Sequence, residues 1–542
     1  MTSTKSRFRS STGVLIASLT IYAVLIISCC HYQRLTGDAT LYLSIAEKYL
    51  RGDFANAING YWGPLLSWLL VPFLYVGATH VYAINTMHLF LGLFTITGIW
   101  RLSYKFEMSE TIRCIILAAL VPVLLFVSLI EPMDFLLLCV LVYYFNVVFS
   151  RDYPKKVFHA VTCGILGGLA YYSKPYGFPF FISHFMLINV CHYFAQSSAG
   201  HRKNVIRNAA AGFVVFVLIS GVWIALISNK YDHLTFSNQG RGVFASLGPG
   251  SEHNTLEKGD PIFFEGFFAP PNDTAFVIYE DPTYARKKTW NPLESRSLLK
   301  HYLGNLLQNI FEGIRIYESF SRLSVAIIIA YILLIFFQPV RTLFDRPDLL
   351  YPLLTVALYT GGYMPFHFEI RYLWPVNILL LLMGGRVLNE LFKSVFFRSD
   401  LMKNILMTIF LLSFIATPLK TSIDMSRNNL NRSMHDLGEE LDRRYDLDGN
   451  IASNVQKEQH TVYDSWHRTF RLSYWLKGRY FGQPRENISD RELEREFEKY
   501  NIDYYFFWGD STDTPEVLSR YKEITNRDIP GLFIYSIKER KK

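Results

Sequence analysis

Cysteine is scarce in this 542-residue sequence, and none of its six cysteines lies beyond residue 191. The long segments 229–318 and 419–542 therefore contain no thiol, which excludes a disulfide framework and a thiolate zinc cluster from both. Charge is also sparse, since only 18% of the residues are Asp, Glu, Lys or Arg. The chain has neither an internal repeat nor a low-complexity linker, which argues against a transporter built from two repeated halves.

Apolar side chains are abundant and gathered in blocks. Hydrophobic residues make up 50% of the chain and aromatic residues 16%. A bilayer core of about 30 Å requires roughly 20 apolar residues per helix. Blocks near that length predict an α-helical polytopic membrane protein with about eleven spans, at 12–31, 85–104, 112–130, 133–150, 157–173, 177–195, 209–228, 320–337, 349–366, 373–392 and 401–418.

The formal net charge of +8 comes mostly from Lys and Arg in every second short loop between these blocks. The positive-inside rule places those loops in the cytoplasm, so the charge is a topology signal and does not indicate nucleic acid. The amino terminus is then predicted to be cytoplasmic. The outer loops 32–84 and 229–318 and the carboxyl terminus are predicted to be extracytoplasmic.

Beyond residue 418 hydrophobicity falls and charge rises. Segments 435–446 and 490–500 carry acidic and basic side chains three and four residues apart, which is typical of surface helices. Segments 502–509 and 531–538 are short apolar runs typical of buried strands. We therefore predict two domains, a membrane domain at 1–418 and a small extracytoplasmic α/β domain at 419–542.

The first outer loop is charged although it directly follows the first apolar block. Leu41, Ile45 and Tyr49 repeat at helical spacing, and Asp38 stands where it could begin that helix as its N-cap. The run 63–77 begins with Gly-Pro and is too short to span a bilayer. Both segments are predicted to be helices in the membrane interface, where a membrane-bound molecule and a water-soluble one can meet.

These motifs resemble the GT-C superfamily of glycosyltransferases that use polyprenyl-phosphate sugars. The resemblance is specifically to protein O-mannosyltransferases and aminoarabinose lipid A transferases, which typically show D-E-x-x-Y followed by K-P-P-L-x-x-W-L. The matching residues are Asp38, Tyr42, Pro64, Leu65, Trp68 and Leu69. Ala39 replaces the second acid, and Trp62-Gly63 stands where Lys-Pro is common. Segments 131–145, 164–181 and 366–376 resemble later motifs in the same order, so the resemblance covers most of residues 12–390.

The implied reaction transfers a sugar from a lipid phosphate to a hydroxyl group. It needs a carboxylate to accept the hydroxyl proton and cations to hold the departing phosphate. Asp38 is the candidate base, and Arg371 and Lys174 are candidate phosphate ligands at predicted outer span ends. The other expected substrate-binding residues are Tyr42, Asp134 and Tyr372. The structural alternatives are helix capping for the two aspartates and interfacial anchoring for the two cations.

His367 and Glu369 stand two residues apart beside Arg371 and could in principle ligate a divalent cation. On a helix, however, this spacing points them to different faces. No cofactor is therefore predicted, and a divalent cation stays open.

The sequence thus predicts an integral membrane hexosyl- or pentosyltransferase. The partners are a polyprenyl-phosphate-linked sugar donor and a glycan, lipid or protein hydroxyl, and inversion is implied by the resemblance. The expected location is the inner or plasma membrane of a bacterium, with segment 229–318 covering the acceptor side. One alternative is a transporter or flippase of lipid-linked saccharides, which would carry ionisable groups near the bilayer midplane. A further alternative is a noncatalytic partner of another membrane enzyme, because Ala39 stands where the resembling proteins carry a second acidic residue.

Overall fold

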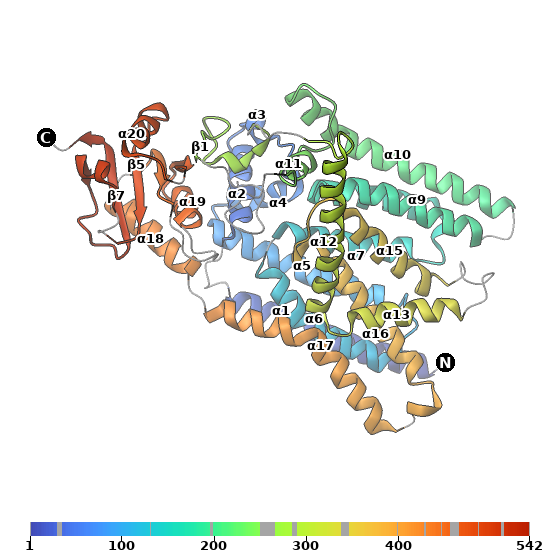
Figure 1. Cartoon of the computed structure of the whole chain (residues 1–542). Coiled ribbons are helices and arrows are strands. Elements are labelled where there is room, and N and C mark those ends of the chain that lie inside the picture. The colour runs from blue at the N-terminus through green and yellow to red at the C-terminus, as the bar shows by residue number, and fades with distance from the viewer. Residues whose placement is uncertain are drawn as a thin grey trace.

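The computed structural model places a helical bundle beside a carboxy-terminal sheet (Figure 1). The end of the bundle that faces this sheet is here called the sheet end, and the opposite end is the far end. The structure describes residues 2–29, 35–130, 132–195, 199–249, 266–284, 290–337, 346–397, 399–427, 430–445, 447–455, 465–485, 487–510 and 514–540.

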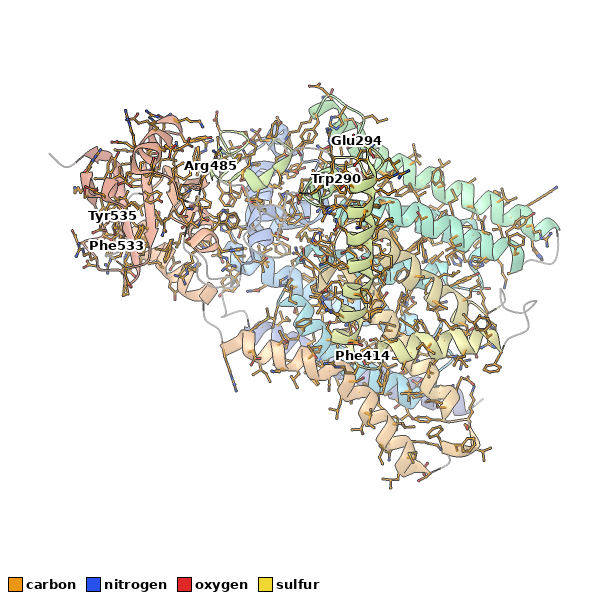
Figure 2. All side chains as sticks on the ribbon, in the orientation of Figure 1. Trp290, Glu294, Phe414, Arg485, Phe533 and Tyr535 are labelled. Atoms are coloured by element: carbon orange, nitrogen blue, oxygen red, sulfur yellow. The ribbon has the colours of Figure 1, made fainter. Side chains whose placement is uncertain are left out.

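A helix covers or overlaps each of the predicted apolar blocks. These helices are α1 (Thr2–Cys29), α5 (His80–Ser103), α6 (Glu110–Ser128), α7 (Pro132–Val148), α8 (Val157–Ser173), α9 (Gly177–Ala195), α10 (Ala199–Lys230), α13 (Ser324–Phe336), α15 (Pro347–Tyr363), α16 (Trp374–Leu391) and α17 (Asp400–Arg427). Among the described residues, six helices are long and apolar enough to cross a membrane, or up to seven if α12 (Arg296–Phe320) and α13 form one bent span. The polytopic fold is confirmed, and the number eleven stays a prediction. Side chains fill the space between the helices, as Phe414 of α17 illustrates (Figure 2).

Shorter helices gather at the sheet end. They are α2 (Gly37–Leu50), α3 (Phe54–Ala57), α4 (Pro64–Tyr75) and α11 (Gln239–Ala245). The prediction of helices after the first span is confirmed, and the alternative role of Asp38 as the cap of α2 is wrong. Thr36 caps α2, because its hydroxyl accepts a hydrogen bond from the Ala39 amide at 3.2 Å, and Asp38 lies inside the first turn.

Two close approaches of backbone position the corners around Asp38 and Lys174. A Cβ at Gly63 would come within 2.5 Å of the Tyr172 carbonyl, so only glycine lets the start of α4 lie against the end of α8. A Cβ at Gly362 would clash with the Tyr176 ring, which stacks on Tyr363 with centroids 3.9 Å apart.

The carboxy-terminal residues form a five-stranded mixed sheet in the order β3-β2-β5-β7-β6. Strand β2 is parallel to β3 and β5, whereas β7 is antiparallel to β5 and β6. The elements are α18 (Leu430–Arg444), β2 (Asn450–Ser453), α19 (Ser465–Trp475), β3 (Arg479–Tyr480), β4 (Gly482–Gln483), α20 (Asp490–Lys499), β5 (Tyr504–Trp508), β6 (Tyr521–Glu523) and β7 (Leu532–Arg540). Helix α17 continues through Pro418 to Arg427, so the predicted boundary falls within a helix. The division into two domains stays a prediction.

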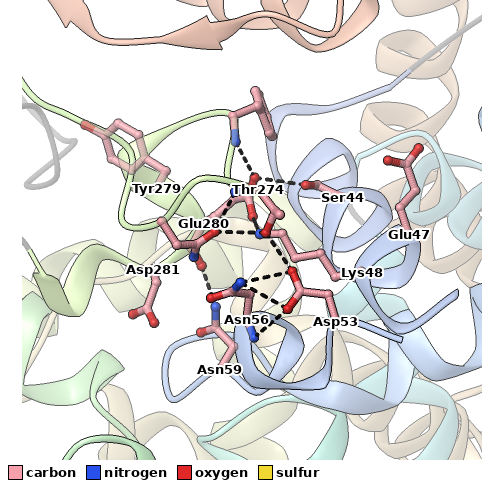
Figure 3. Close-up of polar contacts among 12 residues, drawn as sticks. Ser44, Glu47, Lys48, Asp53, Asn56, Asn59, Thr274, Tyr279, Glu280 and Asp281 are labelled. Atoms are coloured by element: carbon pink, nitrogen blue, oxygen red, sulfur yellow. Dashed lines mark hydrogen bonds and ion pairs between the residues drawn. The ribbon is translucent and has the colours of Figure 1, made fainter. Parts of the chain in front are cut away.

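The segment after α11 joins this sheet to α2. Strand β1 (Gly266–Phe267) pairs with β4, and the Tyr480 amide donates to the Phe276 carbonyl at 2.6 Å. The same segment then forms the short 3₁₀ helices η3 (Ile278–Glu280) and η4 (Pro282–Tyr284). Glu280 makes a buried ion pair with Lys48 of α2, and Ser44 donates to the same carboxylate at 2.9 Å (Figure 3). A buried charge is costly unless it is paired and hydrogen-bonded, so these contacts fix α2 against the segment.

Candidate functional site

Four of the residues singled out in the sequence meet at the sheet end. Asp38 lies in the first turn of α2, Asp134 in the first turn of α7, Lys174 directly after α8 and Arg371 in the short helix η5 (Ile370–Leu373). Arg371 Nη1 donates to Asp38 Oδ2 at 2.7 Å, and Lys174 Nζ donates to Asp134 Oδ1 at 2.6 Å. Arg371 Nε and Asp134 Oδ2 are 3.7 Å apart, which brings the two pairs together.

Glu369 is the fifth member of this group, here called the charged cluster (Asp38, Asp134, Lys174, Glu369 and Arg371). Arg371 Nε donates to Glu369 Oε2 at 2.6 Å, and the Tyr372 hydroxyl donates to Oε1 at 2.6 Å. His367 Nε2 lies 3.4 Å from the same Oε1. The expectation that His367 and Glu369 point apart is wrong. The chain is extended at Glu369, with φ −121° and ψ 150°. In an extended chain, side chains two residues apart lie on the same side.

The two half-exposed carboxyls of the cluster differ in electrostatics. Burial raises the pKa of Asp38, and the guanidinium of Arg371 offsets this only in part. Burial also acts to raise the pKa of Glu369, but Arg371 and hydrogen bonds from His367, Arg371 and Tyr372 hold that pKa below its usual range. Environments that push neighbouring carboxyl pKa values apart are typical of acid–base sites, and here the proton is favoured on Asp38.

Asp134 has an unsatisfied oxygen. Its side chain is buried, and Oδ2 has no hydrogen-bond partner among the described residues, only the longer ion-pair contact to Arg371. Buried polar atoms are rarely left without a partner in native proteins. The cluster therefore retains one acceptor that a ligand or water could satisfy.

A cavity of about 320 Å³ borders the cluster. Lys174, Tyr363, His367 and Tyr372 line one side of it, and Lys174 Nζ lies 3.6 Å from the centroid of the Tyr372 ring. A second part of the lining is formed by Phe236, Ser237, Gln239, Gly240, Arg241 and Val243. The cavity thus combines two cations with aromatic faces, a lining suited to an anion attached to an apolar or sugar group.

Of the predicted catalytic and substrate-binding residues, only Lys174 and Tyr372 line the cavity itself, and Asp38, Asp134 and Arg371 adjoin it through the charged cluster. Tyr42 is buried in the core, its ring edge-on to Trp62 with centroids 5.4 Å apart, and its backbone carbonyl accepts the Ser67 hydroxyl at 2.9 Å. Its role in substrate binding stays a prediction. Conversely, sequence reasoning missed Arg241, which is a single arginine in a glycine-rich stretch without periodicity.

The cluster as arranged does not fit a divalent cation. Among the residues that the structure describes, no three His, Cys, Asp or Glu side chains are grouped to hold a metal ion. Each carboxylate of the cluster is already paired with Arg371 or Lys174.

Comparison with known proteins identifies the fold. No protein-family model matches the sequence, and no curated protein matches it closely. The structure resembles ArnT from Cupriavidus metallidurans bound to undecaprenyl phosphate, with a TM-score of 0.56 and 12% identity over 97% of this chain and 98% of that one. It also resembles the oligosaccharyltransferase AglB from Archaeoglobus fulgidus, solved with an inhibitory peptide and a dolichol-phosphate, with a TM-score of 0.52 and 13% identity over 96% of this chain and 74% of that one. An oligosaccharyltransferase from Archaeoglobus fulgidus, also similar in structure with a TM-score of 0.52 and 13% identity, has been crystallised with Zn and sulfate. These likenesses show that the chain shares the fold of ArnT and AglB, and together with its apolar helices they support an integral, multi-pass membrane protein.

Proposed function

We propose that a chain with this fold and this charged cluster is a glycosyltransferase that takes a sugar from a polyprenyl phosphate. The single observation that carries the proposal is the Asp38–Arg371 ion pair beside a cavity that Lys174 lines. Support for a lipid-phosphate donor comes from the two similar structures, which hold undecaprenyl phosphate and dolichol-phosphate. The acceptor is a hydroxyl of a glycan, lipid or protein, and the transfer inverts the anomeric centre.

In the proposed reaction, one bond forms at the anomeric carbon of the donor sugar and another bond to the same carbon breaks. The acceptor oxygen forms a bond to the anomeric carbon while its proton passes to the Asp38 carboxylate. The bond between that carbon and the phosphate oxygen breaks, and its electron pair leaves with the polyprenyl phosphate. Lys174 and Arg371 stabilise the charge on the departing phosphate, joined by Arg241 from the second part of the cavity lining.

Asp134 and Glu369 are positioning residues in this proposal. Asp134 holds the ammonium of Lys174 and Glu369 holds the guanidinium of Arg371, each through a hydrogen bond of 2.6 Å. Fixed donors need no reorganisation when charge develops on the phosphate, and this is the main source of electrostatic catalysis.

The test is consumption of radiolabelled polyprenyl-phosphate sugars by the purified protein in detergent. We expect one sugar class to be consumed with release of polyprenyl phosphate, and Asp38→Asn to abolish most of that release. A well-folded protein that binds such donors but consumes none of them, with any hydroxyl acceptor offered, would contradict the proposal.

One observation favours the alternative of a transporter or flippase of lipid-linked saccharides. His184 is fully buried inside the bundle, with Nδ1 2.9 Å from the Tyr144 hydroxyl and Nε2 2.7 Å from the Thr355 hydroxyl. Hydrogen-bonded ionisable groups within spans are common in transporters. Movement of an intact lipid-linked saccharide across sealed vesicles, without cleavage, would favour this alternative.

We also propose that the sheet end faces away from the cytoplasm, as the distribution of Lys and Arg predicts. Leu293 and Phe396 are 81% and 90% exposed and lie in segments predicted on opposite sides of the membrane. Cysteine at Leu293 should react with an impermeant thiol reagent in intact cells, and cysteine at Phe396 should not. The reverse pattern would invert the topology.

A further inference from the structure

Helix α12 does not run along the bundle. The helix is 25 residues long, and the chain bends by 100° between it and α13, which follows after a break of three residues. In Figure 1, α12 stands across the bundle while α13 lies along it. An angle of 100° to α13 is the geometry expected of a helix that lies along the membrane surface beside a span.

Three faces of α12 have different surroundings. One face is an exposed apolar stripe with residues three or four apart, each between 38% and 58% exposed, formed by Leu299, Leu303, Leu307, Ile310, Phe311 and Ile314. Next to the stripe, Gln308 and Arg315 are exposed and polar. The third face packs against the protein at Ile316 and Phe320.

The protein-facing side of α12 contacts both sides of the cavity. The Asn309 side-chain amide donates to the carbonyls of Met364, at 2.8 Å, and of Phe366, just before the segment that carries His367, Glu369 and Arg371. On the other side, His301 Nε2 lies 2.8 Å from the Leu247 carbonyl, directly after α11.

Trp290 strengthens the contact between α12 and the segment after α11. Its ring is stacked on Phe244 of α11, with centroids 5.0 Å apart, and lies near one end of α12 in Figure 2. Since Arg241 and Val243 of α11 line the cavity together with Phe366 and His367, α12 contacts both segments that carry these lining residues.

We propose that the apolar stripe of α12 is seated among the lipid acyl chains of one leaflet, and that α12 holds the two sides of the cavity in place from there. The occupant is lipid because the stripe adjoins the exposed apolar surface of α13, where Ile329, Leu333 and Phe336 are 52%, 50% and 79% exposed. The exposed polar residues beside the stripe match a helix half in lipid and half in water. This inference is independent of whether the cluster transfers a sugar.

The seating is tested by spin labels on single cysteines in lipid nanodiscs, with the native cysteines replaced. A label at Leu307→Cys should collide more often with oxygen than with a water-soluble nickel chelate. The matched control is Gln308→Cys, one residue further and about 100° around the helix, where the preference should reverse. Leu303→Cys repeats the measurement on the stripe if Leu307→Cys does not fold.

Two outcomes would overturn the seating. Equal nickel accessibility at 307 and 308 would place the stripe in water. Low accessibility to both reagents at 307 would mean that protein covers the stripe.

The coupling to the cavity is tested by hydrogen exchange of the amides at 364–368. Asn309→Ala removes both hydrogen bonds and should speed this exchange by about tenfold or more, without changing the lipid signature of a label at 307. Gln308→Ala is the control and should leave the exchange unchanged. Unchanged exchange in Asn309→Ala would show that α12 does not hold this side of the cavity. Neither readout needs a donor, so failure here is distinct from failure of the proposed transfer reaction.

Discussion

The charged cluster at the sheet end has a counterpart at the far end of the bundle. This far-end network consists of Glu107, Arg346, Asp348, Arg386 and Glu390. Arg386 is 4% exposed and lies within 3.4 Å of Asp348 and 3.2 Å of Glu107. It also donates to the Glu107 backbone carbonyl at 3.1 Å, which ties the loop between α5 and α6 to α16.

The two groups are alike in burial and pairing but differ in what surrounds them. The far-end network bonds to the backbone and joins elements of the bundle. The charged cluster borders a cavity, places an aromatic ring over Lys174 and leaves Asp134 Oδ2 without a hydrogen bond. Buried charge by itself thus indicates structure, whereas a charged cluster that borders a cavity and also holds an unsatisfied acceptor indicates chemistry.

The largest expected effect is on stability and arises at the far end. Arg386→Met removes the buried cation that joins Glu107, Asp348 and Glu390. This change should lower the free energy of unfolding by about 3 kcal/mol, although Arg346 still pairs with Asp348 and Lys393 with Glu390. Turnover per folded molecule should stay near normal. Unfolding in detergent measures the first quantity and transfer assays the second, with Arg315→Met, at a surface pair, as the control. A tenfold loss of turnover in the folded Arg386→Met protein would contradict the assignment of a structural role to the far-end network and a chemical role to the charged cluster.

Asp38→Asn should produce the opposite pattern. Asparagine keeps the size of the side chain but cannot accept the proton, so turnover should fall about 10²-fold or more. Stability should hardly change, because Thr36 and not Asp38 caps α2. Asp53→Asn, at the cap of α3, is the matched control and should transfer sugar normally. Near-normal turnover in Asp38→Asn would remove the proposed base.

Arg371→Ala should weaken donor binding by about 1.5–3 kcal/mol, the typical contribution of a hydrogen bond to a charged group. Arg371→Lys should restore part of this affinity, since lysine keeps the charge without the planar fork. Titration with a nonhydrolysable donor analogue measures both variants. Unchanged affinity in Arg371→Ala would return this residue to the role of an ion-pair partner of Asp38 and Glu369.

The pH profile separates the two groups further. A base acts only when deprotonated, so turnover falls as the pH drops through the pKa of Asp38, and burial moves this loss above the ordinary value of about 3.9. Removing the Arg371 guanidinium disfavours the charged form of Asp38. Arg371→Gln should therefore move the acid limb of the pH profile to higher pH by about one unit. Arg386→Met should leave the limb in place. An acid limb that Arg371→Gln does not move would assign it to another group.

The smallest effect is expected for Tyr372→Phe. The change removes one hydrogen bond to Glu369 and should cost about 1 kcal/mol in transfer efficiency. The aromatic face over Lys174 remains, so donor affinity should change less than turnover. A larger loss of affinity than of turnover would place the Tyr372 hydroxyl on the donor itself.

The sequence predicted the fold because lipid imposes long apolar blocks that are visible without any tertiary information. It also singled out four members of the cluster, since Asp134, Lys174 and Arg371 lie at the ends of such blocks and Asp38 belongs to the motif of the first outer loop. The pairing of Arg371 with Asp38 and of Lys174 with Asp134 was not predictable, because it depends on how distant helices pack.

Three local features were misjudged for physical reasons. Capping of α2 was considered as an alternative role for Asp38 because Thr36 and Asp38 are both good capping residues two positions apart. Helix α12 was hidden within a segment treated as a covering loop, because polar and charged residues dilute its apolar stripe. His367 and Glu369 were separated by assuming a helix where the chain is extended.

The pairing of β1 with β4 has a consequence for how the protein is made. Residues 266–267 find their partner strand at 482–483, near the end of the chain. During synthesis the membrane helices before and after this segment can insert while it still lacks its partner. Segment 266–284 contains Glu280, which pairs with Lys48 of α2, the helix that also carries Asp38. This segment can therefore complete its contacts only after nearly the whole chain has been synthesised. An interrupted or truncated chain would reach the membrane with its helices in place and its site unassembled, which keeps incomplete copies inactive.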